Sequence, residues 1–455
     1  MPPREGDGRE GSDDLSAERM TGQGQTRDLR RELGLREAVA LGIGGTVGGG
    51  IFVLVGAAAG LAGPAALVAF LAAFAAALVI ALPYAELSCR LPLAGGGYAF
   101  ARKVLGPHWG FVMGWGYWGA YVFVSGYVTI GFGGYLQAAT GLPAAGGAVA
   151  LVAASTALNL LGVKVSGRVQ ALVVLVAVAG LAGFVLWGLP HVALERLEPF
   201  LPYGPRGVFL AALVAFLSFG GFDMVAAAGE EVQRPERNLP RAILLTLSAV
   251  LGLYLLVAVV ALGTVPAARL GVSAAPLAEA AAAFAGQGGR HLVVLIALLT
   301  TAATANAVLV VTSRIVFAMA RDGLLPERLA AVRAATGAPW AAVLASGLLL
   351  AIVGAAGTVA FAAAAGGFLY VLHFVPPLVA LVVLRRRGGA RPAFTTPAPR
   401  LLIPLAFVAS AALVTASGTT GIVFGSGWLV VGLALYRGGA GLRGRRRSTP
   451  RRHRR

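Results

Sequence analysis

The sequence of 455 residues predicts an all-α polytopic membrane protein with about twelve transmembrane helices. Its composition is the first reason: 58% of the residues are hydrophobic and 12% are charged, whereas about 25% are charged in a soluble domain. The second reason is that the apolar residues form runs of the length a spanning helix needs, about 20 residues. So little charge excludes a water-soluble protein of this size, and the apolar content excludes disorder for most of the chain.

Twelve apolar runs follow one another along the chain. They cover roughly residues 36–60, 65–88, 108–137, 146–162, 168–189, 207–229, 241–262, 291–318, 340–355, 360–384, 401–417 and 419–437.

The positions of the basic residues predict how these spans are oriented. A net charge of +18 would favour a nucleic-acid partner in a soluble protein, but here Lys and Arg lie in the two tails and in alternate loops. If the N-terminus is cytoplasmic, 33 of the 37 basic residues are on that side, and Arg196, Arg206, Arg269 and Arg290 are outside. The positive-inside rule therefore predicts a multi-pass protein of the cell membrane with both termini cytoplasmic and no nucleic acid among its partners.

Glycine interrupts the apolar pattern of two spans. In the first span Gly48, Gly49 and Gly50 are consecutive, and glycine costs about 1 kcal/mol relative to alanine at each helical position. The sixth span contains a milder interruption, Ser-Phe-Gly-Gly-Phe-Asp, at residues 218–223. Close helix packing through small residues is the alternative explanation, but three consecutive glycines do not follow a packing period. We therefore expect both spans to be unwound at mid-membrane.

Unwound backbone at membrane depth is tolerated where it lines a cavity enclosed by protein. The N-terminus of a half-helix then presents free amides to a carboxylate, and the carbonyls that end a half-helix accept hydrogen bonds from an ammonium group. Two interrupted spans in corresponding positions of two repeats are the sequence pattern of a transporter site. Because the interrupted spans are five apart, spans 1–5 and 6–10 are predicted to be inverted repeats.

The chain therefore divides into five predicted parts. Residues 1–33 form a disordered cytoplasmic tail, since they mix both charge signs and lack the apolar core of a signal peptide. Residues 34–200 form the first repeat, 201–390 the second, and 391–437 hold spans 11 and 12. Residues 438–455 form a basic cytoplasmic tail that is expected to contact anionic membrane lipid.

Four segments resemble amino acid permeases of the amino acid–polyamine–organocation superfamily, in the order and spacing of that family. They are the glycine motif at 42–52, the stretch from Tyr84 to Trp115, the stretch 219–243 and the stretch 313–326. The resemblance runs from about Gly34 to Leu435. It implies a five-plus-five inverted-repeat (LeuT-type) core with spans 1 and 6 interrupted, and secondary transport by alternating access.

The resemblance also implies roles for particular residues. The amides of Gly49 and Gly50, with Gly48 beside them, are expected to bind the substrate carboxylate, and the Thr46 carbonyl to face its ammonium group. The other backbone partners expected for the ammonium group lie in span 6: Leu217, Ser218 and Gly220.

Five further residues are candidates for gating or coupling. Phe216, Phe219 and Phe222 are candidates for an aromatic gate, with core packing as the alternative. Asp223 is an ionisable residue inside a span and so a functional candidate, either in gating or in holding the broken helix. Asn306 lies where some relatives place an asparagine, with a simple interhelical hydrogen bond as the alternative.

Departures from the family pattern narrow the expected substrate. Some relatives carry a lysine midway along span 5, where this chain has Ala177, and an acidic residue in span 3, where it has Ala120. We therefore expect neutral amino acids, apolar or small. Proton or sodium symport and exchange both stay open.

No cofactor, metal site or enzyme activity is expected. The five histidines are dispersed, Cys89 stands alone and no nucleotide-binding Walker motif occurs. Two alternatives to an amino acid transporter stay open: an amine or polyamine permease, and a channel or sensor that uses the same scaffold without transport.

Overall fold

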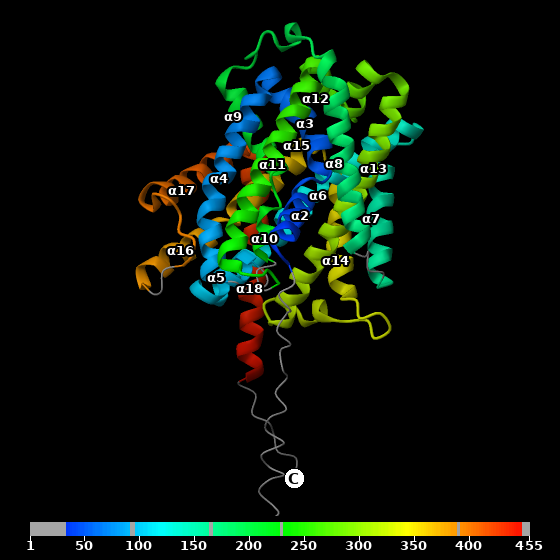
Figure 1. Ribbon diagram of the computed structural model, residues 1–455. Coiled ribbons are helices and arrows are strands. Elements are labelled where there is room, and N and C mark those ends of the chain that lie inside the picture. The colour runs from blue at the N-terminus through cyan, green and yellow to red at the C-terminus, as the bar shows by residue number, and fades with distance from the viewer. Residues whose placement is uncertain (1–32, 92–95, 163–166, 228–230, 389–391, 448–455) are drawn as a thin grey trace, which may run out of the picture.

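The computed structural model describes residues 33–91, 96–162, 167–227, 231–388 and 392–447 (Figure 1). Within these ranges every regular element is a helix, apart from an isolated bridge between Leu33 and Val232. The predicted all-α architecture is confirmed. The predicted N-terminal tail, except Leu33, and residues 448–455 of the predicted C-terminal tail lie outside the described residues.

Helices occupy each of the twelve ranges in which a span was predicted. They are α2 (Leu35–Thr46) with α3 (Gly49–Ala62), α4 (Ala66–Arg90), α6 (Pro107–Thr140), α7 (Ala144–Leu160), α8 (Gly167–Gly188), α9 (Gly204–Ser218) with α10 (Phe222–Ala227), α11 (Pro235–Thr264), α13 (Pro276–Arg321), α14 (Trp340–Ala356), α15 (Val359–Leu372) with α16 (Val375–Arg387), α17 (Pro399–Ala416) and α18 (Gly418–Arg447). Two shorter α-helices, α5 (Gly96–Leu105) and α12 (Ala267–Val272), lie between them.

Both predicted interruptions are present, and a third break was not predicted. The third is milder and lies between α15 and α16, at His373 and Phe374, whose backbone angles stay in the α-helical region; Val375, Pro376 and Pro377 follow. The helix α18 also continues to Arg447, so that part of the predicted basic tail is helical.

By length and composition, eight helices among the described residues are long and apolar enough to cross a membrane, or nine if the bent pair α6–α7 is one span. That number counts Gly49–Arg90 as one stretch, although the chain turns at Gly63, where φ is +64°. It also leaves out α14, which has 17 residues. The protein is thus a multi-pass membrane protein, whereas twelve spans, the repeat boundaries and the cytoplasmic termini stay predictions.

Small residues let the helices of this bundle approach closely. On α4, a stripe of fully buried alanines at helical spacing lies on one face: Ala66, Ala69, Ala73, Ala77 and Ala81. The helix α4 packs against α9 and α11. Close packing of this kind drives helix association in lipid, where the hydrophobic effect contributes little between helices. The half-helices α2 and α10 are in contact, as are α3 and α9, so the two interrupted spans lie together inside the bundle (Figure 1).

Candidate functional site

The first helix break leaves backbone amides at the N-terminus of α3. The helix α2 ends at Thr46, and Val47 and Gly48 have non-helical backbone angles before α3 begins at Gly49. The first amides of a helix have no partner within the helix. The Gly49 amide finds its partner on another helix, since it donates to the Thr304 hydroxyl of α13 at 3.1 Å.

The three glycines of this break have different surroundings. A Cβ atom on Gly48 would lie 2.7 Å from Thr304 Oγ1, and one on Gly49 would lie 2.8 Å from Val128 Cγ1. On Gly50, by contrast, a Cβ atom would be 3.6 Å from its nearest neighbours, Ser218 Cα and the Tyr127 hydroxyl. Gly48 and Gly49 are therefore required by close packing, whereas Gly50 has room for a methyl group.

The second helix break touches the first through backbone atoms. The helix α9 ends at Ser218 and α10 begins at Phe222. Between them Gly221 has φ +122°, and a Cβ atom there would lie 2.5 Å from the carbonyl carbon of Gly45. Only glycine fits this contact, because the backbone angle and the space both exclude a side chain.

A cavity of about 1130 Å³ reaches both breaks. Its inner end is lined by Gly49, Gly50, Tyr127, Val128 and Leu217. From there it opens at the end of the molecule where α2 begins, among four exposed residues: Glu37, Leu41, Arg314 and Gly337. On the predicted orientation this opening is cytoplasmic.

All seven predicted binding residues line the cavity: Thr46, Gly48, Gly49, Gly50, Leu217, Ser218 and Gly220. The Thr46 carbonyl is already engaged, since it accepts hydrogen bonds from the Gly48 amide and from the Tyr254 hydroxyl, both at 2.9 Å. Two bonds use both lone pairs of a carbonyl oxygen. The Leu217 carbonyl is likewise engaged, since it accepts bonds from the Gly220 amide at 3.2 Å and from the Phe219 amide at the end of α9.

The three candidate gate phenylalanines are absent from the cavity lining that the structure describes. Phe216, Phe219 and Phe222 are at most 1% exposed and pack in an aromatic core. Phe222 stacks on Phe374, with ring centroids 5.1 Å apart, and Phe219 packs against Tyr254. In this conformation the three phenylalanines are therefore part of the packed core, which was the alternative to a gating role.

Asp223 is buried at 2% exposure, outside the cavity lining, and lies among hydrogen-bond donors. Its carboxylate accepts bonds from the hydroxyls of Tyr117, Tyr121 and Tyr370 at 3.1–3.3 Å, and from the Gly221 amide. His373 Nε2 lies 3.7 Å from Asp223 Oδ2. Tyr121 and Tyr370 also line the cavity, so they connect its wall to the buried carboxylate.

Asn306 lines the cavity and makes the interhelical hydrogen bond that the alternative predicted. Its side-chain oxygen accepts a bond from the amide of Asn159 on α7 at 3.0 Å. Asn159 also lines the cavity. The pair joins α7 and α13 along one wall.

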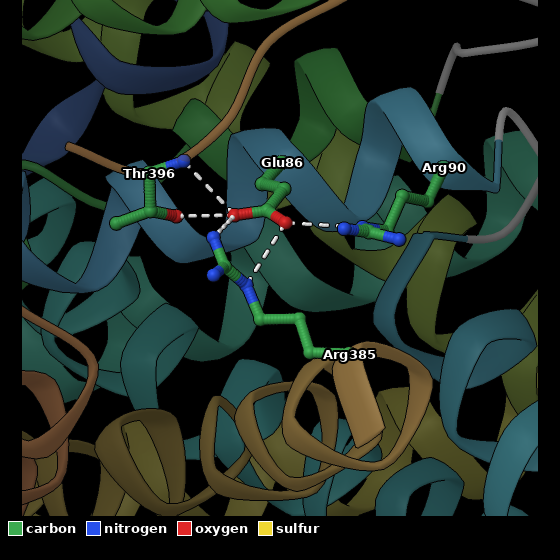
Figure 2. Close-up of polar contacts among 4 residues, drawn as sticks. All are labelled: Glu86, Arg90, Arg385 and Thr396. Carbon is green, nitrogen blue, oxygen red and sulfur yellow. Dashed lines mark hydrogen bonds and ion pairs between the residues drawn. The ribbon is translucent and has the colours of Figure 1, made fainter. Parts of the chain in front are cut away.

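A second buried carboxylate lies away from the cavity and joins three segments. Figure 2 shows Glu86 of α4 surrounded by Arg90, Arg385 and Thr396. Arg385 of α16 forms a two-pronged ion pair with it, Arg90 donates at 3.0 Å, and Thr396 donates through its amide at 2.9 Å and its hydroxyl at 2.8 Å. Glu86 is fully buried, and five hydrogen bonds satisfy its charge.

Outside the spans, α5 is tied to the end of α13. The Tyr98 hydroxyl donates to Asp322 Oδ2 at 3.1 Å, and Arg102 forms an ion pair with the same carboxylate. Burial and the negative charge of Asp322 raise the pKa of the Tyr98 hydroxyl above its usual range. The hydroxyl therefore remains a donor at neutral pH.

Several residues at the site carry no sequence signal of their own. Thr304 and Tyr254 are a threonine and a tyrosine in apolar helices, and their partners at the first break are more than 200 residues away. Tyr117 and Tyr121 share a helical face, and their spacing of four could have suggested a polar stripe on α6. Among the described residues, no group of three or more histidine, cysteine or acidic side chains is placed to hold a metal ion.

A bundle of apolar helices, with a cavity that meets two broken helices, defines the class of the protein as a membrane transporter. Comparison with known proteins agrees. The family model described as amino acid permease matches residues 33–435. The chain therefore belongs to this family, within the amino acid–polyamine–organocation superfamily, whose members are transporters and not enzymes.

Similar proteins differ in the substrates that their names state. The branched-chain amino acid permease BcaP of Bacillus subtilis is 31% identical over 432 residues, covering 90% of this chain and 93% of that protein. The methylthioribose transporter of the same organism is 30% identical over 449 residues, covering 92% and 95%. The vacuolar cationic amino acid transporter 2 of Arabidopsis thaliana is 31% identical over 357 residues, covering 72% and 55%.

Proposed function

We propose that this protein is a secondary active transporter that moves neutral amino acids across the cell membrane by alternating access. The observation that carries the proposal is that one cavity reaches both helix breaks. A zwitterion there meets amides at the start of α3 and carbonyls at the end of α9, without a charged side chain. The opening beside α2 corresponds to an inward-facing state.

The carboxylate is assigned to Gly50 and the neighbouring amides of α3. Gly50 lines the cavity and has room for no more than a methyl group on its side-chain face, while the Gly49 amide donates to the Thr304 hydroxyl. The ammonium group is assigned to the carbonyls of Ser218 and Gly220, with the Leu217 carbonyl beside them at the end of α9. Thr46 contributes its carbonyl only when one of its two present hydrogen bonds is released.

Charge on the cavity wall supports a neutral side chain. Among the cavity-lining residues that the structure describes, the charged ones are Glu37 and Arg314, both at the open end. A charged substrate side chain at the inner end would be buried without a partner, at a cost of several kcal/mol. Branched-chain amino acids are the substrates named for one similar permease. Their uncharged side chains are compatible with an inner end that has no charged lining residue among those described.

Coupling is assigned to Asp223. It is an ionisable group inside a span, and Tyr121 and Tyr370 connect it to the cavity. Whether the driving ion is a proton or sodium, or whether the protein exchanges substrates, is decided by the gradient arms of the experiment below. The aromatic core of Phe216, Phe219 and Phe222 adjoins the broken helix, and we assign it to the closing movement.

Uptake into proteoliposomes tests the proposal. A panel of labelled amino acids is offered with a proton gradient, with a sodium gradient and with neither, and counterflow is measured in parallel. Saturable uptake or counterflow of neutral amino acids is expected. If none of the panel is taken up or exchanged, the proposal fails; uptake of polyamines alone, or ion conductance alone, supports the alternative classes instead.

Gly50→Ala tests the carboxylate site. The added methyl group has room in the fold but occupies the face that the carboxylate would approach, so we expect KM to rise about tenfold, which corresponds to roughly 1.4 kcal/mol. The matched control is Gly252→Ala on α11, where a Cβ atom meets nothing within 4 Å. An unchanged KM in Gly50→Ala would show that the carboxylate binds elsewhere.

A further inference from the structure

Two buried serine hydroxyls on the cavity wall have no hydrogen-bond partner. Among the residues that the structure describes, three buried side-chain polar atoms are unpartnered: Ser125 Oγ, Ser218 Oγ and His373 Nε2. The histidine atom lies 3.7 Å from the Asp223 carboxylate. Both serines line the cavity, and they are 0% and 1% exposed.

Many other buried hydroxyls of the bundle have a partner in their own helix. Thr46, Thr300 and Ser410 each donate to the carbonyl four residues earlier, at 2.7–2.8 Å. A buried polar group without a partner costs about 1–3 kcal/mol. The two exceptions lie on the wall of the same cavity, which indicates that a bound molecule supplies the missing partners.

The two hydroxyls belong to different helices, Ser218 to the end of α9 and Ser125 to α6. Gly50 is next to Ser218, and a Cβ atom on Gly50 would be 3.6 Å from Ser218 Cα. Ser218 thus belongs with the backbone groups of the two breaks. Ser125 lies on α6, which is unbroken, and shares a face with Val128, the residue that packs against Gly49. Ser125 is thus about one helical turn along α6 from the residue that contacts the first break, outside the backbone groups of the two breaks.

We propose that Ser125 hydrogen-bonds a hydroxyl group on the substrate side chain, and that the transporter prefers small hydroxyl-bearing amino acids to their apolar isosteres. The inference rests on the proposed function and adds the substrate class. The serine side chain has three staggered rotamers, so its hydroxyl turns toward the ligand without backbone movement. A site with a buried hydroxyl disfavours an analogue that leaves this group unpaired.

Threonine and valine are the appropriate probes, because they differ only by a hydroxyl in place of a methyl group. In proteoliposomes, wild-type protein is expected to take up L-threonine with kcat/KM about tenfold above that of L-valine. A tenfold ratio is what the free energy of about one neutral hydrogen bond produces. L-serine and L-alanine form a second pair with the same expected direction. In Ser125→Ala the threonine-to-valine ratio is expected to fall toward one.

Three controls distinguish this role from a general effect on binding. Ser218→Ala should lower kcat/KM for threonine and valine by the same factor, leaving their ratio unchanged. Ser410→Ala, which removes a self-satisfied hydroxyl on α17 away from the cavity, should leave both values unchanged. Ser125→Thr, which keeps the hydroxyl, should retain the preference. Thermal unfolding of each variant in detergent establishes that it is folded.

The possible failures are separable. If no amino acid is taken up, the proposed function fails and the inference with it. If amino acids are taken up but wild-type protein does not prefer threonine to valine, the inference alone fails, and this result needs no variant. It also fails if Ser125→Ala lowers both substrates equally, because the hydroxyl then serves the part common to all amino acids.

Discussion

Glu86→Gln is expected to lower the stability of the protein strongly, although glutamine has nearly the same size and shape as glutamate. The substitution keeps the shape of the side chain but removes the charge that Arg385 and Arg90 share. A glutamine offers one acceptor oxygen and one NH2 donor, whereas all five bonds to Glu86 come from donors on Arg90, Arg385 and Thr396 (Figure 2). Whichever way the amide is oriented, at least two donors lose their acceptor.

The size of the effect follows from burial. Glu86 is fully buried, and the Arg385 side chain is 25% exposed, so the arginine is left with only partial hydration. Removing one partner of a buried ion pair costs about 3–5 kcal/mol. With an unfolding entropy of roughly 2.1 cal/mol/K per residue, this corresponds to a midpoint lower by about 3–5 °C.

The assay is thermal unfolding in detergent, followed by tryptophan fluorescence. The matched control is Glu279→Gln, which breaks another Arg–Glu pair, with Arg269, whose side chain is 69% exposed. An exposed pair contributes about 0–1 kcal/mol, so this variant should melt within about 1 °C of wild type. Equal midpoints for Glu86→Gln and Glu279→Gln would refute the reasoning from burial.

Three further predictions concern the helix breaks and the end of α13. Gly221→Ala should prevent accumulation of folded protein, measured by size-exclusion chromatography in detergent, because φ is +122° and the Cβ atom would lie 2.5 Å from the Gly45 carbonyl carbon; a monodisperse, active variant would contradict this. Asp223→Asn should abolish gradient-driven accumulation in proteoliposomes while counterflow continues, and retained accumulation would remove Asp223 from coupling. Tyr98→Phe removes one hydrogen-bond donor to Asp322 but leaves the ion pair between Asp322 and Arg102. The melting midpoint of the variant should fall by no more than about 2 °C, since one hydrogen bond contributes about 1 kcal/mol. A larger fall would show that the tyrosine is essential to this contact.

The sequence predicted the helical architecture and both helix breaks because these depend on local properties. Apolar runs of membrane length and three consecutive glycines act on the backbone wherever they occur. The same local character led to the prediction of a carboxylate site at Gly49 and Gly50, and both residues line the cavity. The break at His373 was missed, although Pro376 and Pro377 follow it closely.

What surrounds the breaks was decided by packing between distant segments. Phe219 and Phe222 are neighbours of the second break in sequence, yet each finds aromatic partners and is buried away from the cavity. Thr304 holds Gly49 across 255 residues, and Tyr254 reaches Thr46 across 208. No local pattern encodes such pairs, since they arise only when whole helices pack.

The sequence by itself thus determined that this is a multi-pass helical protein of the amino acid permease family with two interrupted helices. The tertiary structure alone decided which groups face the cavity, that Glu86 is clamped by Arg385 and Thr396, and that the Ser125 and Ser218 hydroxyls are left without partners. The physical reason is the distance along the chain over which each interaction acts. Helix formation and helix breaking depend on residues within a few turns, whereas burial and hydrogen bonding of a side chain depend on which segments the fold brings beside it.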